Sequence, residues 1–215
     1  MRQGRWLGMV IALGALLAQA GCATKAPVVV DPVLAAARQR LVKNPGDPRP
    51  QLALAELYFQ RHDYLRATQY LSLVEDQAAR QRREGIDAER VFQLGVLIAV
   101  HGQHYSQAIR RCEARLEQVM EDHRTRGLLA SLLEAIGDEL AAERQWRLMV
   151  ALQPKEASHL LSLARFYQRT ERVDRNQLAQ RLYSRYLELE PAGPEAARVK
   201  AALRLQQLDE TLASE

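Results

Sequence analysis

The chain has 215 residues, 47% of them hydrophobic and 26% charged, and a formal net charge of +4. Ala, Leu, Arg, Gln and Glu dominate, and because these residues favour helix, the composition predicts an all-α protein. Basic and acidic residues are interleaved along the chain, as on a solvated helical surface, so we expect no nucleic-acid partner.

Residues 1–21 have the three parts of an export signal. Arg2 and Arg5 make a positive start, and residues 6–18 form an apolar stretch. This stretch is too short to cross a bilayer, which needs about 20 residues. Small residues then lead to Cys22. We therefore expect residues 1–21 to be a signal peptide rather than a membrane span.

Two cleavage sites compete at the end of this segment. Residues 18–20 (AQA) fit a signal-peptidase site, and a cut there leaves a soluble periplasmic protein that begins at Gly21. Residues 20–22 (AGC) resemble the lipobox of bacterial lipoproteins, in which the cysteine is diacylated and becomes the new N-terminus. Gln19 departs from that pattern, which usually has Leu at this place. We expect lipidation of Cys22, because a lone cysteine between a leader and a tether is hard to explain otherwise.

Residues 22–33 are expected to tether the lipid to the folded part. They contain two prolines and no helical period, and a segment of this length extends over roughly 35 Å at most. Two or more acyl chains give stable anchoring. In bacterial lipoproteins a residue other than Asp after the cysteine implies sorting to the outer membrane, and Ala23 stands here. The resemblance therefore implies an outer-membrane lipoprotein that faces the periplasm.

From residue 34 onward the apolar residues recur at helical spacing, with Pro or Gly between the segments. A helix is expected at 34–43, and four later segments align with one another. Their first halves share Leu, a small residue and a large apolar residue: Leu54-Ala55-x-x-Tyr58, Leu94-Gly95-x-x-Ile98, Leu129-Ala130-x-x-Leu133 and Leu163-Ala164-x-x-Tyr167. Their second halves share an Ala followed one turn later by a large residue: Ala67 and Leu71, Ala108 and Cys112, Ala142 and Trp146, Ala179 and Tyr183.

This pattern, which Pro154 and Pro191 close in the last two segments, resembles the tetratricopeptide repeat (TPR). The repeat has a period of about 34 residues, and its small residues let paired helices approach closely. The resemblance implies a right-handed solenoid of antiparallel helix pairs over residues 34–213. It places the repeats at about 48–80, 88–121, 123–155 and 157–191, with a capping helix at 194–212.

Turn residues fall between the two halves of the first three repeats, at His62-Asp63, Gly102-Gln103 and Gly137-Asp138. The corresponding segment of the fourth repeat, residues 170–176, lacks Gly and is about three residues too long, so we expect a longer loop there. In the capping helix, the face expected to shield the last repeat carries Ala197, Ala201, Leu205 and Leu208.

Candidate chemical sites are few. Cys112 stands where the repeat places a large core residue, so we expect a small buried hydrophobe there. His101 and His104 could share a helix face as metal ligands do, but Gly102 marks a turn between them and no carboxylate or thiol stands at ligand spacing. No nucleophile motif or phosphate-binding loop occurs in the sequence. The sequence therefore predicts a protein that is not an enzyme and has no metal site or cofactor.

The resemblance also implies a concave groove lined by the first helix of each repeat. Phe92, Val96 and Val100 are expected to form an apolar strip flanked by arginines, which suits a peptide with hydrophobic anchors and acidic residues. The asparagine and lysine clamp of chaperone-binding TPR proteins is missing, because Leu52 and Glu56 replace it. The residues predicted to bind a partner in this groove are Arg49, Phe59, Gln60, Phe92, Val96, Val100, Arg124, Ser131, Arg165, Gln168 and Arg169.

Together these features predict an outer-membrane-anchored scaffold that binds a segment of another envelope protein. Repeat lipoproteins of this kind resemble the pilotins and assembly factors of type IV pili and related secretion systems, which implies a role in assembling or localising such a machine. Adaptors for cell-wall enzymes or exopolysaccharide export, and a soluble periplasmic TPR protein, are the alternatives. An enzyme of envelope metabolism and a self-associating structural spacer are two further hypotheses.

Overall fold

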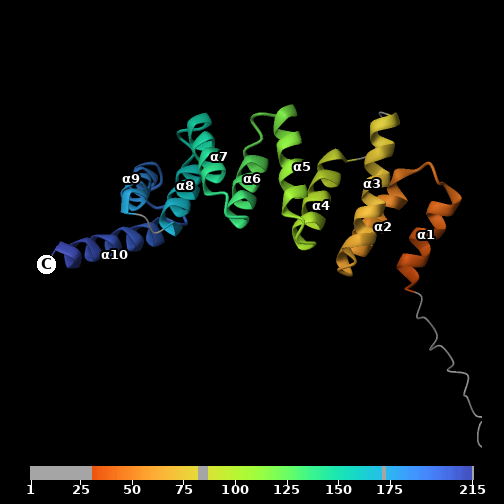
Figure 1. Cartoon of the computed structure of the whole chain (residues 1–215), viewed down its shortest axis with the longest axis horizontal. Coiled ribbons are helices and arrows are strands. Elements are labelled where there is room, and N and C mark those ends of the chain that lie inside the picture. Colours follow the sequence, from red (N-terminus) through yellow and green to blue (C-terminus); the bar gives the residue numbers. More distant parts are fainter. Residues whose placement is uncertain (1–30, 82–86, 171–172, 215) are drawn as a thin grey trace, which may run out of the picture.

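The computed structural model describes residues 31–81, 87–170 and 173–214, and in these ranges the chain is helical with no strand. Successive helices pack against each other, and Figure 1 shows them in one elongated row from α1 to α10. The prediction of an all-α solenoid is confirmed. The helices are α1 (Pro32–Lys43), α2 (Pro48–Gln60), α3 (Tyr64–Gln81), α4 (Ala88–His101), α5 (Tyr105–Gln118), α6 (His123–Ala135), α7 (Glu139–Leu152), α8 (Ala157–Arg169), α9 (Val173–Leu189) and α10 (Ala196–Ser214).

Aspartates fix where six of these helices begin. The carboxylates of Asp47, Asp63, Asp87, Asp122 and Asp138 each accept a hydrogen bond from a backbone N–H in the first turn, at 3.0–3.1 Å. Such caps satisfy amides that have no partner inside the helix.

Asp31 acts in the same way on α1, accepting from the Val33 amide at 2.7 Å. Helix α1 therefore begins at Pro32, two residues earlier than expected, because proline is well suited to the first helical position. The expected signal peptide, Cys22 and most of the expected tether lie outside the described residues.

The small residues of the repeat lie where paired helices touch. Seven of them are completely buried: Ala55, Ala67, Ala108, Ala130, Ala142, Ala164 and Ala179. At Gly95, a Cβ would lie 2.7 Å from Nη1 of Arg111, so glycine makes room for a guanidinium in this repeat. Cys112 is also completely buried, and burial raises the pKa of its thiol to about 11. The close-packing role of these positions and the core position of Cys112 are confirmed.

Each of the first three repeats turns through a residue with positive φ, at His62 (60°), Gln103 (61°) and Gly137 (82°). These are the middle residues of the turns 61–63, 102–104 and 136–138. The turns predicted from sequence are confirmed, but in the second repeat the left-handed position belongs to Gln103, while Gly102 has φ −79°.

The prediction of a longer loop in the fourth repeat is wrong. Helix α9 begins at Val173, so residues 173–176, which were expected in the loop, form its first turn. Arg175 holds this turn in place. Its side chain is 7% exposed, forms ion pairs with Glu139 at 2.9 Å and Glu143 at 3.4 Å, and lies over the Phe166 ring.

The buried apolar residues form two clusters. The N-terminal cluster extends from Ala37 to Ile98 and joins α1 to α4, and the C-terminal cluster extends from Val96 to Val199 and joins α4 to α10. Helix α4 contributes to both, because Leu94 and Ile98 belong to the first cluster while Val96 and Ala99 belong to the second.

The predicted packing face of the capping helix is wrong. Ala196 and Val199 are the residues of α10 that enter the C-terminal cluster. The predicted face is solvent-exposed, with Leu205 64% and Leu208 59% exposed and with Ala197 and Ala201 also exposed. Apolar residues lie on more than one side of this helix, so helical period alone did not determine which side contacts α9.

Candidate functional site

A pocket of about 320 Å³ lies between the N-terminal parts of α2 and α4. Three of the positions assigned to the groove from sequence, Arg49, Leu52 and Glu56, contribute to its wall. The complete lining is Pro48, Arg49, Leu52, Ala53, Glu56, Asp87 and Arg90.

A second pocket of about 480 Å³ adjoins the first, on the side of α2 that faces α1. The two share Ala53 and Glu56, and we call them together the paired pockets. The predicted groove residue Gln60 lines the second pocket, beside Leu57 and the α1 residues Val33 and Arg40. The paired pockets therefore lie next to each other along α2, one toward α4 and the other toward α1, with Ala53 and Glu56 in the wall of both.

The charges at the first of the paired pockets are matched but remain in contact with solvent. Arg90 donates to both carboxylate oxygens of Glu56, at 2.5 and 2.7 Å, and the side chains of Arg90 and Glu56 are 59% and 25% exposed. The hydrogen bond to Glu56 raises the pKa of Arg90 above its ordinary value. Arg49 pairs with the capping residue Asp47 at 2.9 Å. The wall thus offers a carboxylate and two guanidiniums above apolar Leu52.

Phe59 has a packing role between the first two repeats. Its half-buried ring contacts Tyr64 of α3, with 6.0 Å between centroids, and His101 of α4, edge to face at 5.4 Å. Phe59 thus joins three helices, and the predicted contact with a partner is limited to the part of the ring that stays exposed.

The apolar strip predicted on α4 is largely covered. Val96 is 3% exposed and belongs to the core, and Val100 is half-buried against the same cluster. The guanidinium of Arg115 lies 4.5 Å from the Phe92 ring centroid and is held there by Asp122 at 2.6 Å and by Glu89. The sequence missed this cover because Arg115 comes from a different helix.

The predicted groove arginines of the fourth repeat are neutralised within the chain. Arg165 pairs with Glu195 at 2.7 Å, and Arg169 pairs with Glu134 at 2.5 Å. Gln168 accepts a hydrogen bond from the Tyr183 hydroxyl at 2.7 Å. These contacts join α8 to its neighbours and leave fewer groups for a partner.

Two predicted groove residues lie in α6. The Ser131 hydroxyl donates to the Gly127 carbonyl within that helix at 3.0 Å. Arg124 is exposed and forms no ion pair with any described residue. Of the residues predicted to bind a partner, Arg49 and Gln60 each line one of the paired pockets, and both lie in the first repeat.

Sequence reasoning missed the contributions of Ala53, Arg90 and helix α1. The Glu56–Arg90 pair left a signal, since its partners are 34 residues apart, close to the repeat period. The part played by α1 left none, because it depends on how that helix packs on α2.

The described part of the chain has no group of three or more His, Cys, Asp or Glu side chains placed to hold a metal ion. His101 contacts Phe59 and Tyr64, whereas His104 precedes α5 without capping it. No helix in residues 31–81, 87–170 and 173–214 combines the length and the apolar character that a membrane span requires.

Comparison with known proteins identifies the fold. No family profile and no curated protein sequence matches the chain. Among solved structures, MamA (residues 41 to the end) from Desulfovibrio magneticus RS-1 is similar with a TM-score of 0.57 and 17% identity, over 75% of this chain and 85% of that one. YrrB, described as a TPR protein with an unusual peptide-binding site, is similar with a TM-score of 0.55 and 14% identity, over 78% and 81%. The chain has the TPR fold.

Proposed function

We propose that this chain is a non-catalytic scaffold that binds a segment of a partner protein in the paired pockets. The observation that carries the proposal is the presence of two adjoining pockets along α2, of about 320 and 480 Å³, with apolar walls and exposed charges at the rim. Hollows of this kind accept the anchor side chains of a peptide, while the rim charges select its polar groups. The peptide-binding site of the structurally similar YrrB supports the same kind of role.

The chemistry of the walls indicates which segment fits. Leu52, Ala53 and Leu57 leave room for small or medium apolar side chains. Arg49, Arg40 and the Glu56–Arg90 pair offer both donors and an acceptor. A segment with two apolar anchors and charges of both signs matches this surface better than a uniformly acidic one.

We further propose that the scaffold works at the outer membrane, anchored through Cys22, and aids assembly or localisation of an envelope machine such as a type IV pilus or secretion system. Support comes from residues 1–22, where a basic start, a short apolar stretch and AGC follow one another. A lipid anchor would hold the paired pockets near the membrane, within reach of other envelope proteins.

The binding proposal is tested at Ala53, which lines both of the paired pockets. A photo-crosslinking amino acid placed there in cells of the native organism should capture one discrete partner, identified by mass spectrometry. Ala53→Trp fills the hollow, and we expect it to weaken binding of that purified partner at least tenfold. The matched control is Ser162, which stands two residues before the small residue of α8 as Ala53 does in α2. Equal capture from positions 53 and 162, or full binding by Ala53→Trp, would contradict the proposal.

The anchoring proposal has a separate test. Mass spectrometry of the purified protein should find an acylated N-terminal cysteine, and membrane fractionation should find the protein in the outer membrane. Cys22→Ser should release it into the soluble fraction. An unmodified N-terminus at Gly21 would show instead that the cut after Ala20 is used.

A further inference from the structure

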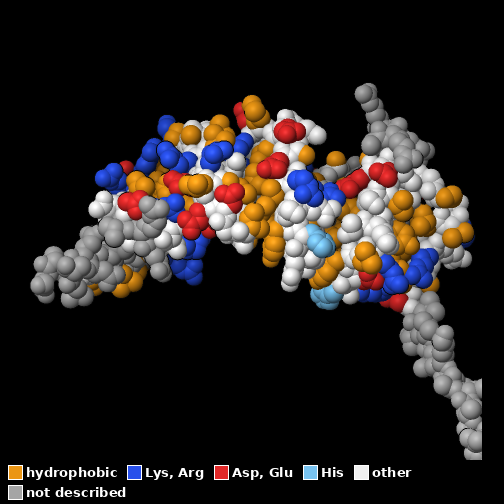
Figure 2. Space-filling view, viewed as in Figure 1, with side chains coloured by type: hydrophobic (Ala, Val, Ile, Leu, Met, Phe, Trp, Pro, Cys, Tyr) orange, Lys and Arg blue, Asp and Glu red, His pale blue; other side chains and the backbone are white. Residues whose placement is uncertain are grey.

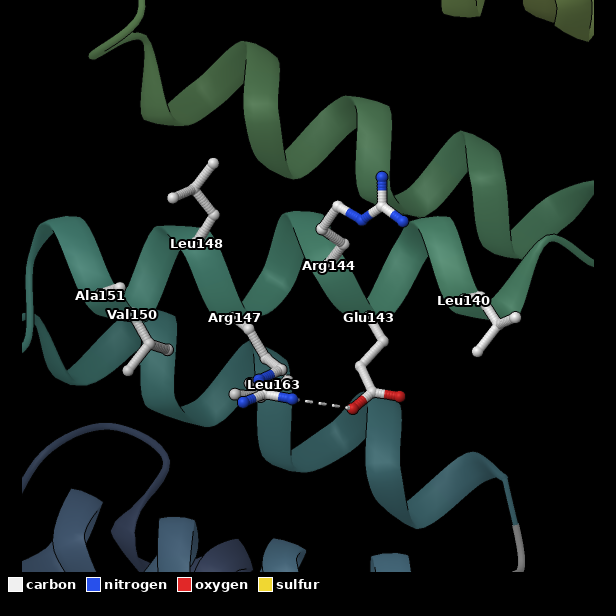
Figure 3. A pocket seen from close by; sticks show the side chains of 8 residues that line it. All are labelled: Leu140, Glu143, Arg144, Arg147, Leu148, Val150, Ala151 and Leu163. Atoms are coloured by element: carbon white, nitrogen blue, oxygen red, sulfur yellow. Dashed lines mark ion pairs between the residues drawn. The ribbon is translucent and has the colours of Figure 1, made fainter.

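A larger groove of about 750 Å³ opens along α7, apart from the paired pockets. We call it the α7 groove. Figure 3 shows Arg144 and Leu148 on one side of α7, and Glu143, Arg147 and Val150 on the other side, near Leu163 of α8. The complete lining is Leu140, Glu143, Arg144, Arg147, Leu148, Val150, Ala151 and Leu163. None of these residues lines the paired pockets.

The groove exposes large apolar side chains. Leu140 is 75% exposed and Leu148 is 38% exposed, and both lie on α7 with about 12 Å between them along the helix axis. Val150 is half-buried and Leu163 is 5% exposed, so they form an apolar base between α7 and α8. Exposed leucines around a hollow offer an apolar surface that a partner could cover.

Positive charge flanks these leucines. Arg144 is exposed and forms no ion pair with any described residue. Arg147 is 68% exposed, and its nearest carboxylate is Glu143 at 3.7 Å.

Glu143 contributes little free negative charge. It also pairs with Arg175 at 3.4 Å and accepts a hydrogen bond from the Tyr167 hydroxyl at 2.9 Å. In Figure 2, Lys and Arg side chains gather beside hydrophobic ones around α7. The α7 groove is therefore apolar inside and basic at its rim.

We propose that the α7 groove binds an acidic amphipathic helix of a partner protein. The leucines would take apolar side chains that recur every three to four residues, and Arg144 and Arg147 would pair with flanking carboxylates. The lining from Leu140 to Ala151 spans about 16 Å, which corresponds to about three helical turns. A helix fits better than a strand, because packed helices offer no free sheet edge for a strand to join.

A protein helix also fits better than a bilayer or an unrelated anion. The apolar base at Leu163 lies in a hollow between helices, where a side chain can enter but a flat membrane surface cannot follow. The exposed leucines would remain uncovered by a small anion. The proposal does not depend on the paired pockets, so the failure of one binding surface leaves the other standing.

The probe is a fluorescent 16-residue peptide of Leu, Ala and Glu, with Leu on one helical face and Glu on the other. Two comparison peptides have the same Leu and Ala positions with Lys for Glu, or the same composition in scrambled order. We expect the full-length chain to bind the first peptide saturably by fluorescence anisotropy, and less tightly as salt rises. Both Arg144→Glu and the pair Leu140→Ser with Leu148→Ser should weaken that binding at least tenfold.

Matched controls come from the first repeat. Leu65 occupies the position in α3 that Leu140 occupies in α7, and it is 72% exposed. Gln69 likewise corresponds to Arg144. Leu65→Ser, Gln69→Glu and Ala53→Trp should each bind the probe as the unaltered chain does.

Four results would overturn the proposal. The first is equal binding of the scrambled or lysine peptide, and the second is unchanged binding by the groove variants. The third is binding to phosphatidylglycerol vesicles that requires Arg144 and Leu140 while the peptide does not bind, which would make a membrane the occupant. The fourth is a concentration-dependent dimer in analytical ultracentrifugation that Leu140→Ser abolishes, which would make a second copy the occupant.

Discussion

The N-terminal cluster, which joins α1 to α4, and the C-terminal cluster, which joins α4 to α10, are built from the same repeat and differ in how they are filled. Tyr58 is the aromatic residue buried in the N-terminal cluster. The C-terminal cluster buries Trp146, Phe166, Tyr167, Tyr183 and Tyr186. Phe59, Tyr64 and Tyr70 pack only partly buried against the N-terminal cluster, so fewer aromatic rings are fully removed from water there.

The surfaces of the first and fourth repeats also differ. In the fourth repeat, Arg165 and Arg169 are paired with Glu195 and Glu134, which tie α8 to its neighbours. In the first repeat the paired pockets open along α2, where α1 and α4 leave a hollow. Both repeats have ion pairs to a neighbouring helix, since Glu56 of α2 pairs with Arg90 of α4. The first-helix face of a repeat can therefore carry such internal contacts and still border an open pocket.

The largest expected effect comes from removing an aromatic residue of the C-terminal cluster. Phe166 is 1% exposed, and Phe166→Ala should lower the free energy of unfolding by about 3–5 kcal/mol, because it leaves a cavity. Hydrogen exchange read by mass spectrometry should quicken over α6–α9 far more than over α1–α3, since repeats contact mainly their neighbours.

Leu54→Ala, in the completely buried centre of the N-terminal cluster, should show the reverse distribution at a cost of about 2–4 kcal/mol. The exposed Leu205→Ala is the control and should change neither region. If both core variants quickened exchange uniformly along the chain, the two clusters would unfold as one cooperative unit and would not differ in local stability.

A smaller effect is expected from the ion pairs that join second helices across repeats. Arg175 is 7% exposed between Glu139 and Glu143, whereas Arg111 is 21% exposed beside Glu75. Arg175→Met should cost about 2 kcal/mol in urea denaturation, and Arg111→Met about 1 kcal/mol, because hydrogen bonds to charged groups count for more where water is excluded. A larger loss for Arg111→Met would show that the N-terminal junction is the stronger one.

The junction at α4 can be examined through Gly95. A Cβ there would lie 2.7 Å from Nη1 of Arg111, so Gly95→Ala must displace the guanidinium that pairs with Glu75. In the Arg111→Ala background this conflict is gone, and the same change should stabilise the helix by about 0.5–1 kcal/mol. A double-mutant cycle measures the difference. Equal effects of Gly95→Ala in both backgrounds would mean that the glycine serves no such purpose.

The smallest effect expected is a pH dependence of the free energy of unfolding that arises at one histidine of the C-terminal half, His159. Burial, with a further contribution from His123, lowers the pKa of His159 below its ordinary value of 6.5, while Glu156 and a hydrogen bond to the Met149 backbone oppose this shift. The folded chain therefore holds the ring neutral where the unfolded chain already binds a proton. The stability from this site is complete above pH 6.5 and is lost as pH falls through the lowered pKa.

Urea midpoints measured between pH 7.5 and pH 5 should show this loss, and His159→Gln should flatten the profile. An identical slope in the unaltered chain and in His159→Gln would assign the dependence to other groups.

Most features of the candidate site could not be predicted from the sequence. The spacing of small residues predicted which positions meet in the helix pairs, because close approach of two helices tolerates little else at Ala55 or Ala164. The groove residues were predicted from their position in the repeat. Whether each of them is free to contact a partner depends on neighbouring side chains from other helices. Arg115 covers Phe92, Glu195 pairs with Arg165, and Ala53 proved to stand at the meeting point of the paired pockets.

Local sequence signals were enough to predict the helical class, the four helix pairs, the first three turns and the core position of Cys112. Each of these depends on the helical spacing of apolar residues or on a small residue where two helices touch. Both signals can be recognised within a short stretch of sequence. Only the tertiary structure decided that the extra residues of the fourth repeat extend α9, which side of α10 is buried, and where hollows open along α2 and α7. Those outcomes depend on side chains that come from different helices and meet only when the solenoid is folded.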